Sequence, residues 1–102
     1  MANTFVNYTD TGVGTAPSTS YTVGASTTAV MIGMTIANVT ASQITVDVQC
    51  AGAYLVKGAA IPAGSSLSVL DGKIILETTD TVVVTSDTAA SADVIISVLE
   101  QT

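Results

Sequence analysis

Apolar and polar residues alternate along most of this chain, and this alternation restricts its backbone to extended strands. In the stretch 44–50 every second residue is apolar, and the stretches 30–36 and 94–98 show a similar pattern rich in β-branched residues. Successive side chains of a strand point to opposite faces, so the pattern gives each strand an apolar face. No stretch repeats apolar residues at the three- and four-residue spacing of an amphipathic helix. The sequence therefore predicts an all-β chain without a helix of any length.

Clusters of glycine, proline and small polar residues divide the chain into about eight or nine short strands. Residues 38–42 predict a hairpin between two long strands, and Ile61–Gly64 predicts a type II-like turn with the proline at its first corner. The pair Asp71-Gly72 is the strongest hairpin signal, because it lies between two apolar stretches. Further breaks are predicted at 12–18, 24–27, 51–52, 78–80 and 86–91.

Short strands at regular spacing predict a single antiparallel β-sandwich domain over residues 1–102, Ig-like or jelly-roll-like, with a small barrel as the alternative. The first strand is predicted around residues 4–8. Residues 1–7 are short and polar enough to serve as an N-terminal arm that adds a strand to a neighbour's sheet.

Charged residues make up only 10% of the chain, against about 25% in ordinary soluble domains. The stretches 82–84 and 94–96 are apolar at consecutive positions, so both faces of these strands are apolar. One face fills the core, and the natural cover for the other is a second subunit. The alternative is a central strand that leaves aliphatic residues in solvent. The predicted interface comprises Val82, Val83, Val84, Ile95, Ser97 and Phe5.

The side chains that most enzymes use are scarce. The chain has no histidine, two lysines, one cysteine and eight dispersed carboxylates, so we expect a protein without enzymatic activity, cofactor or metal. A calcium site would need carboxylates from different turns, such as Asp80 with Asp87. The tyrosines at 8, 21 and 54 are either a sugar-stacking platform or residues at the rim of the core. Cys50 lies in a strand pattern and is expected to be a buried thiol.

The net charge of −6 disfavours binding to nucleic acids and to anionic membranes, because no basic patch can contact phosphates. The first residues lack the basic and apolar regions of a signal peptide, and no apolar stretch approaches the ~18 residues of a membrane helix. We therefore expect synthesis in a cytoplasm without secretion.

Several turn and strand motifs carry a family resemblance. They are Tyr54–Lys57, Ile61–Gly64, Leu67–Lys73, Leu76–Asp80 and Ser97–Glu100. Together with the stretches 1–11 and 21–30, they resemble small virion structural proteins of tailed phages, particularly those of marine and cyanobacterial hosts. These motifs specify a fold and carry no chemistry, so the resemblance transfers no catalytic residue.

The resemblance implies an assembly role in the virion, after synthesis in the host cytoplasm. The expected function is a capsid decoration protein that binds the major capsid shell. A neck, tail-adaptor or fibre-attachment component is the alternative, and a carbohydrate-binding, adhesin-like module is the second alternative. The expected partners are other virion proteins and further copies of the same chain.

Overall fold

The structure is a computed structural model that describes residues 3–70 and 72–102, and within these ranges it contains strands and no helix. The all-β prediction is therefore confirmed. The strands are β1 (Asn3–Val13), β2 (Ser18–Thr22), β3 (Thr28–Asn38), β4 (Ile44–Cys50), β5 (Ala53–Ile61), β6 (Ser66–Ser68), β7 (Ile74–Leu76), β8 (Thr81–Ser86) and β9 (Ala92–Gln101).

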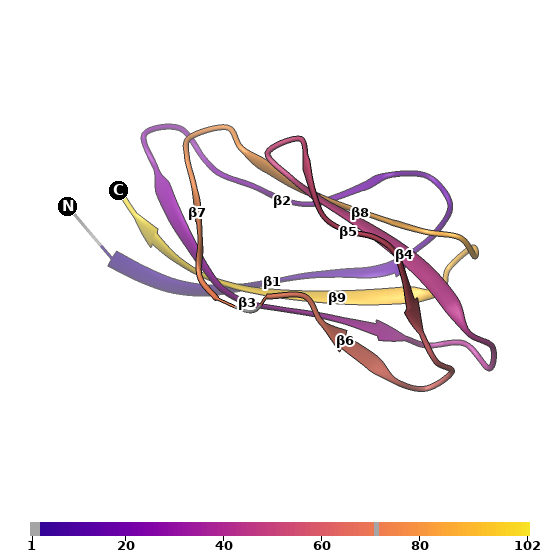
Figure 1. The fold of residues 1–102 in the computed structure, drawn as a ribbon. Coiled ribbons are helices and arrows are strands. Elements are labelled where there is room, and N and C mark those ends of the chain that lie inside the picture. The colour runs from indigo at the N-terminus through magenta and orange to yellow at the C-terminus, as the bar shows by residue number, and fades with distance from the viewer. Residues whose placement is uncertain (1–2, 71) are drawn as a thin grey trace.

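The strands form two antiparallel sheets that pack face to face as a sandwich (Figure 1). Sheet A has the order β1-β9-β3-β6, with β7 also paired to β3, and sheet B has the order β2-β8-β4-β5. If β6 and β7 count as one interrupted strand, the first and last strands are neighbours in one sheet, and the second and next-to-last are neighbours in the other. This is the order of a jelly roll. An Ig-like fold would pair the first two strands in one sheet, whereas β1 and β2 lie in different sheets here.

The inner faces of the two sheets form the core, and the alternation seen in the sequence decides which residues enter it. In β4, Ile44, Val46, Val48 and Cys50 are buried, while the residues between them are half-buried on the outer face. The large side chains that sheet A contributes to the core include Met31, Met34, Ile36 and Ile96. The core is therefore aliphatic, as a chain with few aromatic residues requires.

The first strand is longer than the sequence predicts, because β1 continues through Thr9 and Thr11 to Val13. A register shift between Asp10 and Val13 absorbs the glycine at position 12, whose φ is +66°. Residues 3–7, expected as part of an arm, pair with β9 along their whole length. They are therefore a strand of the chain's own sheet, while residues 1–2 of the expected arm lie outside the described residues.

The predicted hairpin at 38–42 is wrong, because this loop crosses from β3 in sheet A to β4 in sheet B. Asn38 is buried and holds the crossing together. Its side-chain amide donates to the carbonyls of Ser42 at 2.7 Å and Ile61 at 3.0 Å, and its Oδ1 accepts from the backbone N–H of Thr40 at 2.9 Å. The small polar residues of this segment thus serve a crossover and not a tight turn.

The hairpin predicted at Asp71-Gly72 is also wrong, because β6 and β7 both pair with β3 and not with each other. Asp71 itself lies outside the described residues. The eleven residues of β3 offer one long edge, and the two short strands occupy separate parts of it. The tight hairpin lies instead between β4 and β5, where Ala51 and Gly52 have φ of 51° and 85°. Two positive φ angles are the signature of a type I′ turn.

The proline turn between β5 and β6 is displaced by one residue from its predicted position. The N–H of Ser65 donates to the carbonyl of Pro62 at 3.1 Å, which makes Pro62 the first residue of the turn and not its first corner. Gly64 occupies the third position with φ of 68°, as a type II turn requires.

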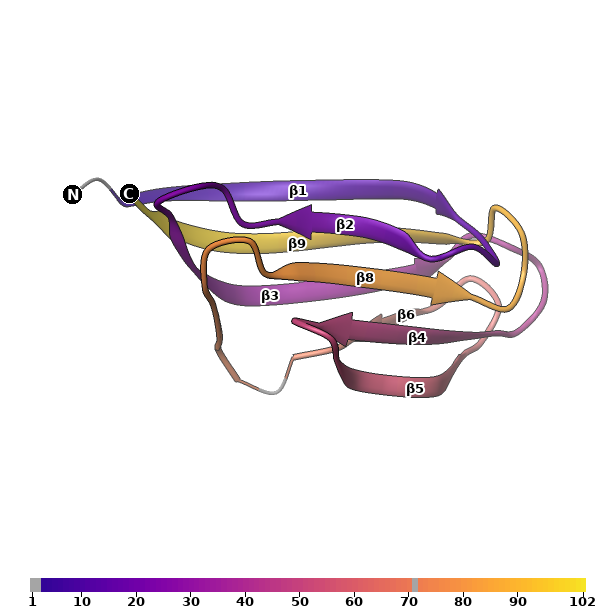
Figure 2. The ribbon, with the colours of Figure 1, turned by 90° about the horizontal axis from the view of Figure 1, so that it is seen from above.

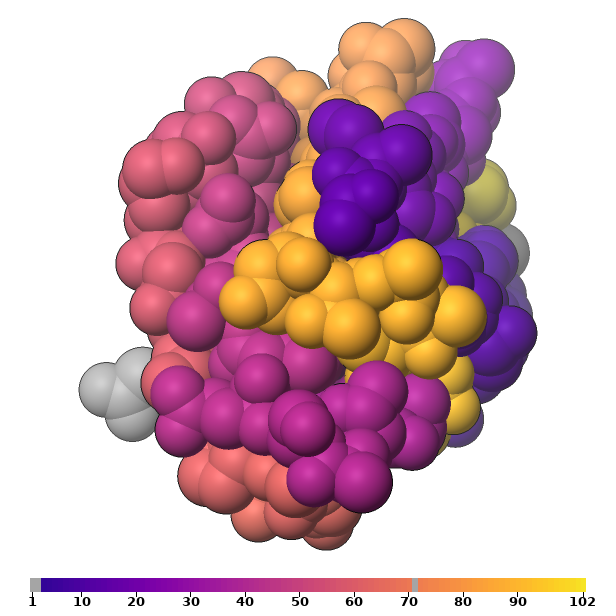
Figure 3. Space-filling view, turned by 90° about the vertical axis from the view of Figure 1, so that its right-hand side faces the viewer, coloured from indigo at the N-terminus to yellow at the C-terminus, as the bar shows by residue number. Residues whose placement is uncertain are grey.

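One end of the sandwich is closed by loops, and in Figure 3 the loop between β8 and β9 lies between the β1–β2 loop and the β3–β4 loop. Ser86 and Ser91 are buried in this end. The N–H of Ser86 donates to the carbonyl of Gly14 at 2.9 Å, and the N–H of Ser91 donates to that of Val13 at 3.0 Å. These contacts satisfy buried backbone groups, so the loop end is structural.

Candidate functional site

The outer face of sheet A carries a row of apolar side chains that crosses four strands. Phe5 of β1 is opposite Leu99 of β9. Leu99 is in turn opposite Val30 of β3, which is opposite Ile75 of β7. Residues directly opposite on one face of a sheet are in contact distance of one another. Two isoleucines on the same face complete a surface that we call the apolar face: Phe5, Val30, Ile32, Ile75, Ile95 and Leu99.

The apolar face is open to solvent in the isolated chain. Phe5 is 73% exposed, Ile75 68%, Ile95 51% and Ile32 42%. Among the described residues, Asp93 is the one charged side chain at an outward position of the sheet A strands, and it lies at the loop end of β9. Ile95 is opposite Thr9 and Thr35, so it lies apart from the row. The exposed apolar row makes this face a candidate site of interaction with another molecule.

A shallow hollow of about 200 Å³ lies within the apolar face, lined by Phe5, Val6, Asn7, Ile32, Ser97 and Val98. The hydroxyl of Ser97 donates to Oδ1 of Asn7 at 2.6 Å across its floor. Gly33 lies opposite Ser97 and adds no side chain, while a register shift at Ile32 bends the strand. Ligand pockets usually measure about 300–1,000 Å³. The hollow is therefore of a size for one side chain of a partner rather than for a cofactor.

The structure brings together three of the six predicted interface residues and separates the other three. Phe5, Ile95 and Ser97 all lie on the outer face of sheet A. Val83 is half-buried on the outer face of sheet B.

The prediction is wrong for Val82 and Val84, which are 0% exposed in the core. A run of three valines in a strand sends the first and third to one face, and here that face is the inner one.

The sequence reasoning missed four residues of the apolar face: Val30, Ile32, Ile75 and Leu99. Ile75 follows Ile74, and Ile32 lies two positions after Val30 with a methionine between them. Such consecutive apolar residues are the same signal that selected the stretches 82–84 and 94–96. The signal was available, but it does not tell which member of a doublet faces outward.

The outer face of sheet B is polar by comparison. Val83 is opposite Gln49 of β4 and Thr19 of β2, and Asp47 is opposite Thr85. Oδ1 of Asp47 accepts the N–H of Gly58 at 2.6 Å, and its Oδ2 lies 3.8 Å from Nζ of Lys57. Hydroxyls, amides and an ion pair thus dominate this face, whereas the outer face of sheet A carries several large aliphatic side chains among its threonines, asparagines and serine.

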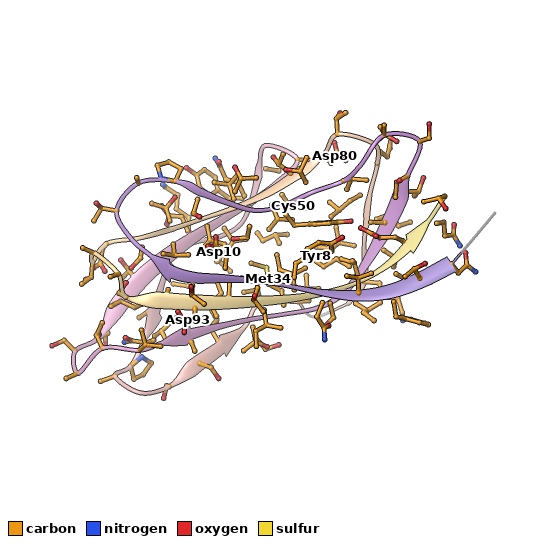
Figure 4. The ribbon with its side chains drawn as sticks, turned by 180° about the vertical axis from the view of Figure 1, so that it is seen from behind. Tyr8, Asp10, Met34, Cys50, Asp80 and Asp93 are labelled. Atoms are coloured by element: carbon orange, nitrogen blue, oxygen red, sulfur yellow. The ribbon has the colours of Figure 1, made fainter. Side chains whose placement is uncertain are left out.

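The three tyrosines do not form a common platform. Tyr8 and Tyr21 face each other between the sheets with ring centroids 4.6 Å apart, and Figure 4 shows Tyr8 in the space between the layers. Their hydroxyls donate to Oε2 of Glu100 at 2.9 and 2.6 Å. Tyr54 lies on β5, with Nζ of Lys57 4.5 Å from its ring centroid. Tyr8 and Tyr21 are rim-of-core residues, as in the second interpretation.

The environment of this tyrosine pair opposes ionisation. Burial, then the hydrogen bond to Glu100 and the charge of that carboxylate, raise the pKa of Tyr21 above its ordinary value. The same three causes raise the pKa of Tyr8. Both hydroxyls therefore stay protonated at neutral pH and serve as donors to the carboxylate, which places a negative group at the rim of the core with its oxygen satisfied.

The two loop carboxylates considered for calcium lie far apart. Asp80 precedes β8 and Asp87 follows it, a separation of about 23 Å for an extended segment of this length. Oδ2 of Asp80 accepts the N–H of Glu77 at 2.9 Å, and Oδ1 of Asp87 accepts that of Thr45 at 3.1 Å. Within residues 3–70 and 72–102, no three His, Cys, Asp or Glu side chains gather as metal ligands.

Cys50 is buried on the inner face of sheet B, as predicted, with 7% of its surface exposed (Figure 4). Burial, and then the charge of Asp80, raise the pKa of its thiol above the ordinary value. The thiol is therefore a core group and not an activated nucleophile. No helix long and apolar enough to cross a membrane occurs in the described part of the chain.

Comparison with known proteins identifies the fold but not a family. No family model matches the chain, and no curated protein matches it. A solved structure of the disulfide-linked pili that form Bacillus endospore appendages is similar, with a TM-score of 0.57 and 18% identity over 99% of this chain and 87% of that one. At this identity the likeness shows a shared β-rich fold.

Proposed function

We propose that this chain is a non-enzymatic structural subunit of a tailed-phage virion, and that it decorates the capsid by docking its apolar face on the major capsid shell. The observation that carries the proposal is the exposed apolar row from Phe5 to Ile75 across four strands of sheet A. The virion is the assembly to which the turn and strand motifs of the sequence point. Synthesis in the host cytoplasm belongs to the same proposal.

The size of this face supports a stable contact. Three strands of ten or eleven residues and two of three residues present on the order of 600 Å² in projection, polar positions included. This is a large part of the ~800 Å² that each partner of a standard interface buries. The face is nearly free of charge, so desolvating it costs little. The hollow at Asn7 and Ser97 offers a place for one projecting side chain of the shell.

A subunit of a filamentous appendage is the second candidate, and the likeness to the Bacillus endospore pili favours it. Those pili are disulfide-linked. Cys50 is buried in the core, so filaments of this chain would be held together without a disulfide from that residue. The same apolar face would then contact a neighbouring subunit in place of a capsid shell.

Copy number per particle tests the proposal. Purified virions are analysed by quantitative mass spectrometry against the major capsid protein. Hundreds of copies support decoration. Six or twelve copies move the chain to the neck or tail, and its absence from washed particles refutes the virion assignment. Electron microscopy of the purified protein at high concentration separates the second candidate, since filaments formed by the chain alone support an appendage subunit.

A further inference from the structure

The four sheet edges of the molecule differ in how well they are protected against pairing with another chain. The β6–β7 edge consists of two strands of three residues each. The β5 edge has two register shifts against β4 and carries Lys57. The β2 edge is five residues long, contains a register shift and follows Pro17. Short strands, bulges, lysine and proline are the devices by which proteins block edge pairing.

The β1 edge has none of these devices along most of its length. Eight consecutive residues, Asn3–Asp10, pair with β9 without a register shift, so the strand is long and regular. It contains no lysine or proline, and seven of its eleven residues are exposed. Its one charged residue, Asp10, accepts hydrogen bonds from Ser18 and Ser20 at 2.6 and 2.8 Å.

The β1 edge is also accessible. In Figure 2, β1 runs along the margin of the molecule, with β2 and β9 lying inward of it. No strand among the described residues pairs with its outer side. Half of the backbone N–H and C=O groups of an edge strand point away from its sheet and are available to a partner strand.

We infer that β1 pairs antiparallel with β1 of a second copy about a two-fold axis at Asn7, so that two sheets A become one continuous sheet. Opposite residues of an antiparallel pair point to the same face. If the outer faces of the two copies are to lie on the same side, the two-fold axis must pass midway between the two copies of one residue, so that this residue is opposite itself. Centring on Asn7 pairs residues 3–11, and 4–10 of these lie in the stretch that pairs with β9 without a register shift. A centre at Tyr8 would bring the irregular residues 12–13 into the pair.

This register makes compatible neighbours on both faces. On the outer face Phe5 of one copy is opposite Thr9 of the other, and Asn7 is opposite its own copy. On the inner face Val6 is opposite Tyr8. The two Asp10 carboxylates end about 20 Å apart along the pair, at a rise of ~3.4 Å per residue, so they do not repel strongly.

The composition of the edge favours a second copy over a foreign charged peptide. Residues 3–9 carry no charge, so they offer a charged peptide no ionic partner, whereas a copy brings an equally uncharged strand. The contact uses the backbone edge of β1, adjoins the apolar face at Phe5 and Asn7, and applies to either assembly proposed above. It also places the two apolar faces side by side on one surface, which doubles the area that docks.

Position-specific cross-linking tests the pairing. Residues directly opposite in an antiparallel pair have Cα atoms about 4.5–5.5 Å apart, within disulfide range, so Asn7→Cys should form a disulfide-linked dimer of twice the 10.2 kDa chain mass under mild oxidation. Thr9→Cys is the matched control on the same strand and face, because its two copies would be about 14 Å apart. Equal cross-linking of both variants, or of neither at millimolar concentration, overturns the inference.

A charge swap provides a second measurement that needs no oxidation. Asn7→Lys and Asn7→Asp each place like charges opposite each other and should be monomeric by light scattering, with circular dichroism unchanged. Mixing the two variants should restore dimers as mixed pairs. Dimers in either variant alone, or monomers in the mixture, contradict the register.

The outcome can be separated from that of the proposed function. Ile75 lies at the opposite edge of sheet A from β1. A double variant with Ile75→Lys and Asn7→Cys should therefore lose docking of the apolar face but still form the disulfide-linked dimer. Cross-linking without particle binding by the parent chain would sustain the β1 pairing and refute the capsid assignment. Particle binding by a chain that stays monomeric would support the capsid assignment and refute the β1 pairing.

Discussion

The two outer faces of this sandwich obey the same alternation but carry different side chains. Sheet B surrounds Val83 with Thr19, Gln49 and Thr85, and its Asp47 pairs with Lys57. Sheet A presents the six residues of the apolar face with one charged neighbour at its end. Sheet B demonstrates that this fold tolerates a polar outer surface. The apolar surface of sheet A is therefore not a requirement of folding, which supports the proposal that it contacts another molecule.

The largest expected effect separates inner from outer residues within a single strand. Val84→Asp puts an unpaired carboxylate in the core at a site that is 0% exposed, which costs several kcal/mol and unfolds the protein or prevents its expression. Val83→Asp, one residue earlier on the outer face of sheet B, should lower stability by about 1 kcal/mol or less. Urea denaturation of both variants checks this. Equal losses would contradict the assigned faces of β8.

The next effect separates the two outer faces by their role in assembly. Ile95→Lys should leave the fold intact and weaken binding to particles about ten- to a hundredfold, since burying one isoleucine side chain contributes ~1.5–3 kcal/mol. Val83→Lys on sheet B is the matched control and should bind as the parent does. Binding is measured by co-sedimentation with stripped particles.

Salt provides a further test of the same contact. Contacts that bury aliphatic surface hold from about 0.05 to 0.5 M salt, whereas charge-driven contacts weaken as the screening length shortens. If the Ile95→Lys and Val83→Lys variants lost particle binding equally, or if salt weakened binding of the parent steeply, the two outer faces would not differ in their role in assembly.

The next effect is on stability alone and concerns the rim where the two sheets meet at Tyr21 and Glu100. Tyr21→Phe removes a hydrogen bond to a carboxylate and should cost about 1.5–3 kcal/mol. The folded-state pKa of Tyr21 is raised above the unfolded value of 10.0, so its contribution is complete below pH 10 and is lost as pH rises beyond it. The parent should therefore lose melting temperature above pH 10 more steeply than Tyr21→Phe does. Parallel pH profiles would show that the tyrosine is ionised equally in both states.

The sequence was sufficient for what depends on neighbouring residues. Period-two alternation predicted strands, the absence of helix and the burial of Val46 and Cys50, because these follow from which face a side chain takes. It also singled out Phe5, Ile95 and Ser97, which lie together on sheet A. The sparse charge content is the basis of the prediction that another molecule covers part of the outer surface, which stays a prediction.

What the sequence could not predict depends on pairing between distant segments. The Asp71-Gly72 signal favours a local hairpin, yet β6 and β7 both pair with β3, because that long strand provides their hydrogen bonds. Likewise, no neighbouring residue determines that the first and third valines of 82–84 face inward. The register of β8 against β2 and β4 decides which valines face the core, and therefore which could belong to an interface.

The smallest expected effect lies on the polar face of sheet B. Asp47→Asn keeps an oxygen that accepts the N–H of Gly58 and loses only the contact with Lys57, whose side chain is 66% exposed. Exposed ion pairs contribute about 0–1 kcal/mol, so the melting temperature should barely change and particle binding should equal that of the parent. Thermal denaturation and co-sedimentation measure both. A loss of binding would assign sheet B a share in assembly, because the substitution leaves sheet A untouched and removes one charge from the other surface.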